Sequence, residues 1–176
     1  MRVLYLEDDA ADADLTRRWL LRYAPQFRLD IVNTLADAFK RLSAGAPPPC
    51  DIVLTDLRLP DGDGMSLLRE IRARSLPIAV VVITGTGSEK TAVAALKAGA
   101  DDYLVKSADY FERLPVTLES AYHRFHAEAS RRARPLRVLY VEHDECDITL
   151  TLRHLAQHAR NIKLEVATTG STHWPA

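Results

Sequence analysis

Five short aliphatic runs alternate with segments of helical periodicity along the first 130 residues of the chain. In the segments between the runs, apolar residues recur at three- and four-residue spacing, which is typical of amphipathic helices. The runs lack the apolar–polar alternation of half-exposed strands, so we expect strands that are buried on both faces. Five strand–helix units with short connections predict a parallel sheet covered by helices on both faces, an α/β fold. The runs are residues 3–6, 27–32, 51–56, 78–84 and 103–105.

Composition excludes several classes of protein. The chain has 176 residues, a net charge of −1 and 47% hydrophobic residues, as in an ordinary globular protein. The near-zero charge favours neither nucleic acid nor an anionic membrane as a partner. The aliphatic run at residues 78–83 is too short to span a bilayer, and Cys50 and Cys146 are too few and too far apart for a disulfide framework or a zinc site. We expect a cytoplasmic protein with no membrane contact and no direct nucleic acid contact.

The chain also repeats itself. The stretch Arg-Val-Leu-Tyr at residues 2–5 recurs at residues 137–140, and the match continues without a gap to the second strand of each copy. We therefore predict a complete domain at residues 1–130 and a basic linker at residues 131–136 that continues the last helix. A truncated second copy, with the order β-α-β, is predicted at residues 137–176.

Polar residues end four of the predicted strands. The carboxyl ends of parallel strands meet at one edge of a sheet, and sites form there beside the switch in strand order. Clustered carboxylates repel one another unless a cation joins them, and hard oxygen ligands suit Mg²⁺. One carboxylate can then attack a phosphoryl group, while a lysine and a threonine hold its oxygens. The residues at these strand ends are Glu7, Asp8, Asp56, Thr84 and Lys106.

These motifs resemble those of the receiver domains of bacterial two-component response regulators. The stretches VLYLEDD, DIVLTDLRLPDGDG, VVVITGTGSE and GADDYLVK occur in the family's order within residues 1–128. The resemblance implies a flavodoxin-like (βα)5 fold with the sheet order 2-1-3-4-5. It also implies a role in a phosphorelay, with a cognate histidine kinase or phosphotransfer protein as the partner.

The resemblance assigns the phosphoacceptor and metal-binding roles. Asp56 matches the aspartate that a histidine kinase phosphorylates. Glu7 and Asp8 match the acidic pair that holds Mg²⁺, with Asp56 and the backbone carbonyl of Arg58 as further ligands. Asp9 occupies a third position, which varies in the family, and is expected to be a bystander.

The resemblance also assigns a switch. Thr84 and Lys106 match the residues that bind the phosphoryl group, and Tyr103 matches an aromatic residue whose rotation reports phosphorylation. Phosphorylation would draw Thr84 toward the phosphate and let Tyr103 turn inward, shifting an equilibrium of the surface on helix four and strand five. The face formed by helix four, strand five and helix five often makes a dimer, so a homodimer is predicted there. Ser107 stands where the family usually has proline, so the family's cis peptide bond is not expected.

Two other functions compete with a phosphoacceptor that is not itself an enzyme. A phosphohydrolase of the haloacid-dehalogenase type needs a second aspartate two residues after Asp56, where Arg58 stands. The other alternative is a phosphate-independent scaffold built from tandem receiver-like domains. The second copy favours this locally, because His143 replaces the counterpart of the second acid of the metal pair.

Overall fold

The computed structural model describes residues 1–43, 48–85, 89–133, 136–159 and 161–168. The chain divides into two compact units, Met1–His126 and Ala127–Ala176. This boundary lies within a long helix, α5 (Tyr110–Ala133), slightly before the predicted end of the first domain at residue 130. In the described ranges, every helix is too short or too polar to cross a membrane.

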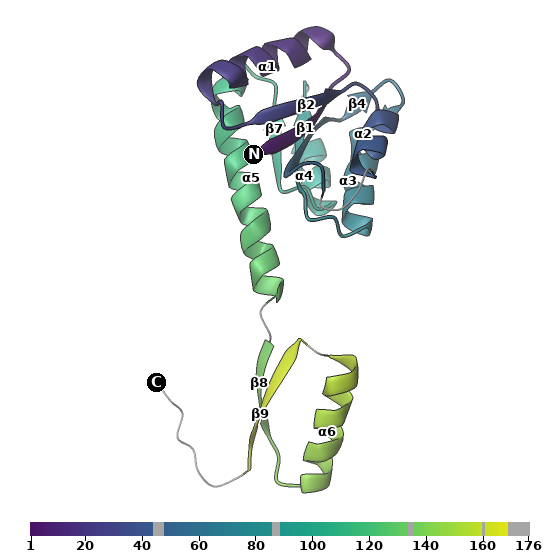
Figure 1. Cartoon of the computed structure of the whole chain (residues 1–176), viewed down its shortest axis with the longest axis vertical. Coiled ribbons are helices and arrows are strands. Elements are labelled where there is room, and N and C mark those ends of the chain that lie inside the picture. Colours follow the sequence, from purple (N-terminus) through teal and green to yellow (C-terminus); the bar gives the residue numbers. More distant parts are fainter. Residues whose placement is uncertain (44–47, 86–88, 134–135, 160, 169–176) are drawn as a thin grey trace. The chain divides into compact units, whose positions relative to one another are not determined.

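The first unit is built on a five-stranded parallel sheet with the order β2-β1-β3-β6-β7. Figure 1 labels three of its strands, β1, β2 and β7. This order corresponds to the predicted 2-1-3-4-5 and confirms the flavodoxin-like fold. Every residue of the central strands β3 and β6 is buried, as expected from their unbroken aliphatic runs. The strands are β1 (Arg2–Leu6), β2 (Arg28–Val32), β3 (Ile52–Asp56), β6 (Ala79–Thr84) and β7 (Asp102–Val105).

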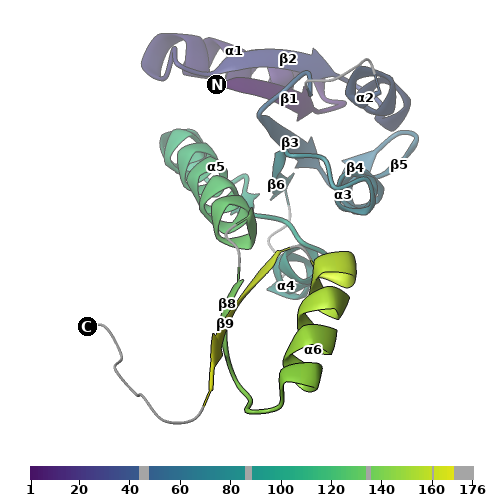
Figure 2. The same cartoon turned by 60° about the horizontal axis from the view of Figure 1, so that its bottom comes forward.

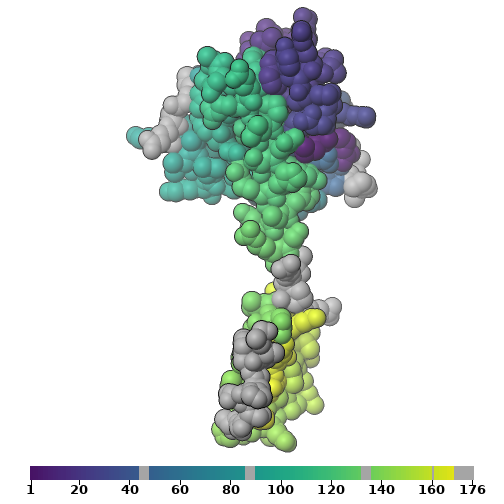
Figure 3. Space-filling view, turned by 90° about the vertical axis from the view of Figure 1, so that its left-hand side faces the viewer, coloured from purple at the N-terminus to yellow at the C-terminus, as the bar shows by residue number. Residues whose placement is uncertain are grey.

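Helices cover both faces of this sheet (Figure 2). One hydrophobic cluster joins alternate strand residues such as Val53 and Val82 to α2, α3 and α4. A second cluster joins the intervening residues, such as Leu54 and Ile83, to α1 and α5. On that second side, Trp19 of α1 stacks on Phe111 of α5 with 6.0 Å between ring centroids. In Figure 3, the green α5 lies beside the purple N-terminal part of the chain on the face turned to the viewer. The helix bounds are α1 (Ala10–Tyr23), α2 (Leu35–Leu42), α3 (Gly64–Ala73) and α4 (Glu89–Lys97).

Three aspartates near the carboxyl edge of the sheet fix the starts of helices. The Asp9 carboxylate accepts hydrogen bonds from two backbone amides in the first turn of α1, and Asp63 does the same for one amide of α3. Asp61 accepts from the backbone amides of Leu35 and Ala36 at 2.9 and 3.0 Å and so ties its loop to α2. The segment between β3 and α3 contains a short antiparallel pair, β4 (Arg58–Leu59) and β5 (Gly62–Asp63), which the sequence pattern did not predict.

In its described residues, the second unit contains the end of α5, a parallel strand pair and one further helix. Strands β8 (Leu136–Val141) and β9 (Ile162–Ala167) pair along their whole length, with α6 (Glu145–His158) between them in the chain. Asp144 caps α6 through two backbone amides, as Asp9 caps α1. No residue of α6 is buried. The order β-α-β agrees with the expectation, and the interpretation of this unit as a truncated second copy of the first domain stays a prediction.

Candidate functional site

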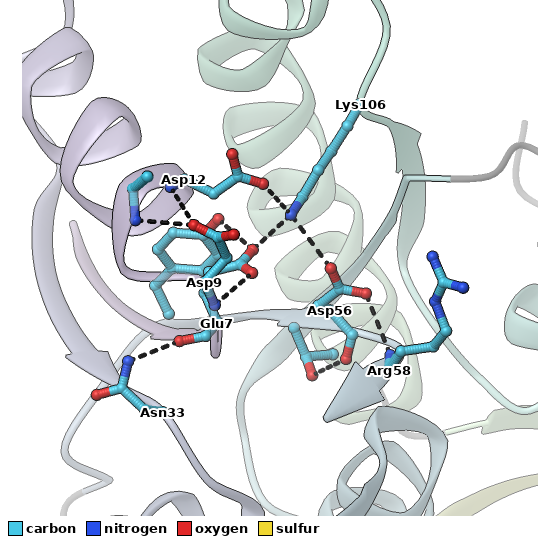
Figure 4. A network of polar contacts seen from close by, with 10 residues as sticks. Glu7, Asp9, Asp12, Asn33, Asp56, Arg58 and Lys106 are labelled. Carbon is cyan, nitrogen blue, oxygen red and sulfur yellow. Dashed lines mark hydrogen bonds and ion pairs between the residues drawn. The ribbon is translucent and has the colours of Figure 1, made fainter. Parts of the chain in front are cut away.

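Asp56 is the last residue of the central strand β3, and its side chain is only 13% exposed. Its carboxylate accepts a hydrogen bond from the Arg58 backbone amide at 3.2 Å (Figure 4). Its backbone carbonyl accepts a hydrogen bond from the Thr55 hydroxyl at 2.8 Å. Gly64 packs directly against this carbonyl, because a Cβ atom at residue 64 would lie 2.1 Å from the oxygen. The backbone around Asp56 is therefore held from both sides.

The Lys106 ammonium lies among three carboxylates (Figure 4). Its Nζ atom is 2.6 Å from Glu7 Oε2, 2.7 Å from Asp12 Oδ2 and 3.2 Å from Asp56 Oδ2. Burial alone would lower the pKa of Lys106, but the hydrogen bonds to Asp12 and Glu7 outweigh it and raise that pKa above its ordinary value. Lys106 is thus a fixed positive charge beside Asp56 at neutral pH.

Glu7 is almost completely buried, at 1% exposure. Besides Lys106, its carboxylate accepts hydrogen bonds from the Tyr5 hydroxyl at 2.8 Å and the Asp9 backbone amide at 3.2 Å. Its backbone carbonyl accepts one from the Asn33 side chain at 2.9 Å. Burial raises the pKa of Tyr5 far above its usual range, so its hydroxyl remains a hydrogen-bond donor. These partners offset the cost of burying the Glu7 charge.

The predicted metal ligands differ in their surroundings. Asp8 is exposed, whereas Glu7 is buried and Asp56 is nearly so. Among the residues with described positions, no three acidic, histidine or cysteine side chains come close enough to form a metal centre. The Lys106 ammonium contacts both Glu7 and Asp56. The donor set is carboxylate, which suits a hard cation such as Mg²⁺, and these roles stay predictions.

Thr84 lies on β6, the strand next to β3, and Tyr103 lies on β7, the edge strand that pairs with β6. Thr84 ends β6, is 3% exposed, and directly follows Ile83, which pairs with Asp56. Tyr103 pairs with Val82 and packs against the core beneath α2, α3 and α4. The Tyr103 hydroxyl is buried, without a hydrogen-bond partner in the part of the chain that the structure describes. Burial raises the pKa of Tyr103.

The sequence interpretation missed two residues of this network, Tyr5 and Asp12. Tyr5 precedes Glu7 by two positions, and residues two apart in a strand share a face, so its proximity was readable from the pattern. Asp12 lies on a helix, and its direction depends on where that helix starts. Asp9, expected to be a bystander, sets that start by capping α1.

A family profile for the response regulator receiver domain matches residues 3–116. The chain belongs to the response regulator receiver family. This receiver domain is 38% identical over 132 residues to methanogenesis regulatory protein FilR1 of Methanothrix harundinacea, covering 74% of the chain and 29% of that relative. It is 46% identical over 125 residues to transcriptional regulatory protein ZraR of Escherichia coli, covering 71% of the chain and 27% of ZraR. The chain therefore spans less than a third of the length of these relatives.

Solved structures agree with the family assignment. The receiver domain of a putative LuxO repressor from Vibrio parahaemolyticus superposes with a TM-score of 0.63 at 28% identity, covering 73% of the chain and 94% of that domain. A beryllofluoride-activated NtrC4 receiver domain dimer superposes with a TM-score of 0.61 at 31% identity, covering 70% of the chain and 98% of that domain. The Mn²⁺-bound response regulator Rcp1 superposes with a TM-score of 0.54 at 27% identity, covering 73% of the chain and 91% of Rcp1.

The comparisons decide between the competing functions. A receiver domain of two-component signalling is confirmed, and no finding favours a phosphate-independent scaffold. The expectation of no nucleic acid contact finds no support, because ZraR is named a transcriptional regulator and the chain covers only 27% of it.

Proposed function

We propose that this receiver domain accepts a phosphoryl group on the Asp56 carboxylate from a histidine kinase or phosphotransfer protein in the cytoplasm. The observation that carries the proposal is the Lys106 ammonium, held 3.2 Å from Asp56 Oδ2. A charge fixed beside the nucleophile stabilises phosphoryl oxygens without reorganisation during the reaction. Arg58 stands where a phosphohydrolase of the haloacid-dehalogenase type has its general acid, so we propose an acceptor rather than a turnover enzyme.

The carboxylates of Glu7, Asp8 and Asp56, with the Arg58 backbone carbonyl, are proposed to hold Mg²⁺. When bound, Mg²⁺ would supply positive charge to the equatorial oxygens of the transferred group. Asp8 is exposed and can approach a cation without breaking a buried contact. Glu7 also accepts a hydrogen bond from Lys106, so its carboxylate would be shared between the ammonium and a bound cation. The solved structure of response regulator Rcp1 is a Mn²⁺-bound form, which supports a divalent cation as a ligand of this domain.

Thr84 and Tyr103 are proposed to carry the signal to the surface. The Thr84 hydroxyl would donate to a phosphoryl oxygen on Asp56, because Thr84 ends the strand next to β3. Thr84 and Val82 both lie on β6, and Val82 pairs with Tyr103 of β7. Movement of Thr84 would therefore change the packing around Tyr103. The resulting shift would alter the surface over α4 and β7.

The test of the phosphoacceptor is the Asp56→Asn substitution. Wild-type protein incubated with acetyl phosphate and Mg²⁺ is expected to gain a hydroxylamine-sensitive acyl phosphate, and Asp56→Asn is expected to gain none. Asp14→Asn makes the same chemical change on α1, where Asp14 pairs with the exposed Arg18, and is expected to be labelled normally. Equal labelling of Asp56→Asn and wild type would disprove the assignment.

A homodimer through the face of α4, β7 and α5 is proposed as the phosphorylated state. Val93 and Leu96 of α4 are 44% and 49% exposed, which leaves apolar surface for a second copy. Asp101 and Asp102 pair inside the domain, with Arg72 and Arg124, so the apolar residues are the better candidates for the contact. Phosphorylated protein is expected to sediment as a dimer and unmodified protein as a monomer. Identical sedimentation of the two forms would contradict this proposal.

A further inference from the structure

Asp12 holds the Lys106 ammonium although no motif assigned it a role. The Nζ atom lies closer to Asp12 and Glu7, at 2.7 and 2.6 Å, than to Asp56, at 3.2 Å. Asp12 comes from the first turn of α1, whereas Lys106 directly follows β7. The contact therefore joins two segments that are 94 residues apart in the chain.

The position of Asp12 is fixed by its own backbone. Its amide donates to the carboxylate of the capping residue Asp9 at 3.0 Å, and the next residue, Ala13, is buried against the sheet. The Asp12 side chain is 48% exposed, in contrast to the buried Glu7. A cavity of about 310 Å³ opens beside Asp12 and Lys106. The ammonium thus has a buried carboxylate on one side and a solvent-facing carboxylate on the other.

The carboxylates of Glu7 and Asp12 differ in whether they are proposed to bind the metal. Glu7 is a proposed metal ligand, so a bound cation would compete with Lys106 for its carboxylate. Asp12 is not among the proposed ligands and can keep its hydrogen bond throughout. A lysine side chain is long and flexible, so an ammonium held by the longer contact to Asp56 alone would spend more of its time away from the site.

We propose that Asp12 is a positioning residue that retains the Lys106 ammonium beside Asp56 while phosphoryl transfer takes place. This inference rests on the proposed phosphoacceptor function of Asp56. It predicts that Asp12 affects the rate of the reaction through Lys106 and leaves the metal affinity almost unchanged.

The test compares Asp12→Asn with Asp14→Asn. Both substitutions remove one charge from α1, at side chains that are each 48% exposed. At saturating Mg²⁺, the initial rate of labelling by acetyl phosphate is expected to fall roughly fivefold in Asp12→Asn, as for the loss of a charged hydrogen bond near the surface. The rate in Asp14→Asn is expected to stay at the wild-type value, and Asp12→Glu is expected to recover most of the rate. The Mg²⁺ concentration that gives half of the maximal rate is expected to change less than about twofold, because Asp12 would act through Lys106 rather than as a ligand.

A second readout uses metal-free protein and needs no reaction. In ¹⁵N-labelled protein, the Lys106 ammonium is expected to give a distinct NMR signal that Asp14→Asn retains and Asp12→Asn loses. The backbone amide spectrum of each variant reports whether it is folded. If wild type is not labelled on Asp56, the proposed function fails. If wild type is labelled but Asp12→Asn matches Asp14→Asn in rate and ammonium signal, only the role of Asp12 is overturned. A shift in Mg²⁺ dependence without a lower maximal rate would also overturn it.

Discussion

Replacing Gly64 with alanine is expected to lower the free energy of unfolding of the receiver domain by about 3 kcal/mol. The added Cβ atom would lie 2.1 Å from the Asp56 carbonyl oxygen and 2.7 Å from the Thr55 hydroxyl. The nearest obstacle is backbone, which cannot move aside as the end of a flexible side chain can. Relief would require β3 and the start of α3 to separate. Urea denaturation followed by circular dichroism measures the loss.

Gly85 provides the matched control for this substitution. Among the described residues, chain neighbours aside, no atom lies within 4 Å of a Cβ built at Gly85, so Gly85→Ala is expected to change the free energy of unfolding by less than about 0.5 kcal/mol. Equal stability of the two variants would show that the packing of Gly64 against Asp56 is not tight. A selective loss in Gly64→Ala would tie the site backbone to the stability of the whole domain.

The second large effect is expected for Lys106→Met, which should prevent labelling of Asp56 and lower the free energy of unfolding by about 3 kcal/mol. Glu7 is 1% exposed and would lose its only cationic partner in the described network. Its carboxylate would keep the Tyr5 hydroxyl and one backbone amide, which cannot balance a buried charge. Denaturation at pH 7 measures the loss of stability, and the acetyl phosphate assay measures the loss of labelling.

The double variant Lys106→Met with Glu7→Gln distinguishes two causes of the lost stability. One is the loss of the ion pair itself, and the other is the cost of leaving the Glu7 carboxylate buried without a cationic partner. Removing both members of a buried pair is less costly than removing one, so the double variant is expected to recover most of the stability. The pKa of Lys106 is raised in the folded domain, so its contribution is complete below the unfolded pKa of about 10.4. This contribution to stability is lost only as the pH rises through the higher pKa that Lys106 has in the folded domain. The difference between wild type and Lys106→Met should therefore be the same at pH 7 and pH 9, and a difference that shrinks in this interval would contradict the raised pKa.

Much of the fold could be predicted, because local hydrophobic periodicity indicates which segments are buried strands and the order of the segments indicates the topology. The unbroken aliphatic runs indicated buried parallel strands, and their order then placed Asp56 and Lys106 at one edge of the sheet. The contact of Asp12 with Lys106 could not be predicted in the same way. It depends on the rotation of α1 about its axis, which the Asp9 cap sets to within one residue. The β4–β5 pair has two residues per strand, too short to leave a periodic pattern.

The two copies of the internal repeat share a sequence pattern but differ in how deeply their strands are buried. Leu4 of β1 is 2% exposed, whereas its counterpart in the repeat, Leu139 of β8, is 47% exposed. Leu6 is fully buried, and its counterpart Val141 is 60% exposed. The pattern alone predicts the same strand in both places. Burial also requires neighbouring strands and helices, and in the described part of the second unit β8 pairs only with β9.

The division of the core into two clusters has a consequence for how the domain can change. Asp56 shares its strand face with Leu54, which packs beneath α1 and α5, the side from which Asp12 reaches Lys106. Tyr103 packs on the opposite side, beneath α2, α3 and α4. One layer of sheet thus separates Asp12, which is proposed to position Lys106 during phosphoryl transfer, from Tyr103, which is proposed to carry the signal. Substitutions on the first turn of α1 are therefore expected to change the rate of phosphorylation while the packing around Tyr103 stays the same.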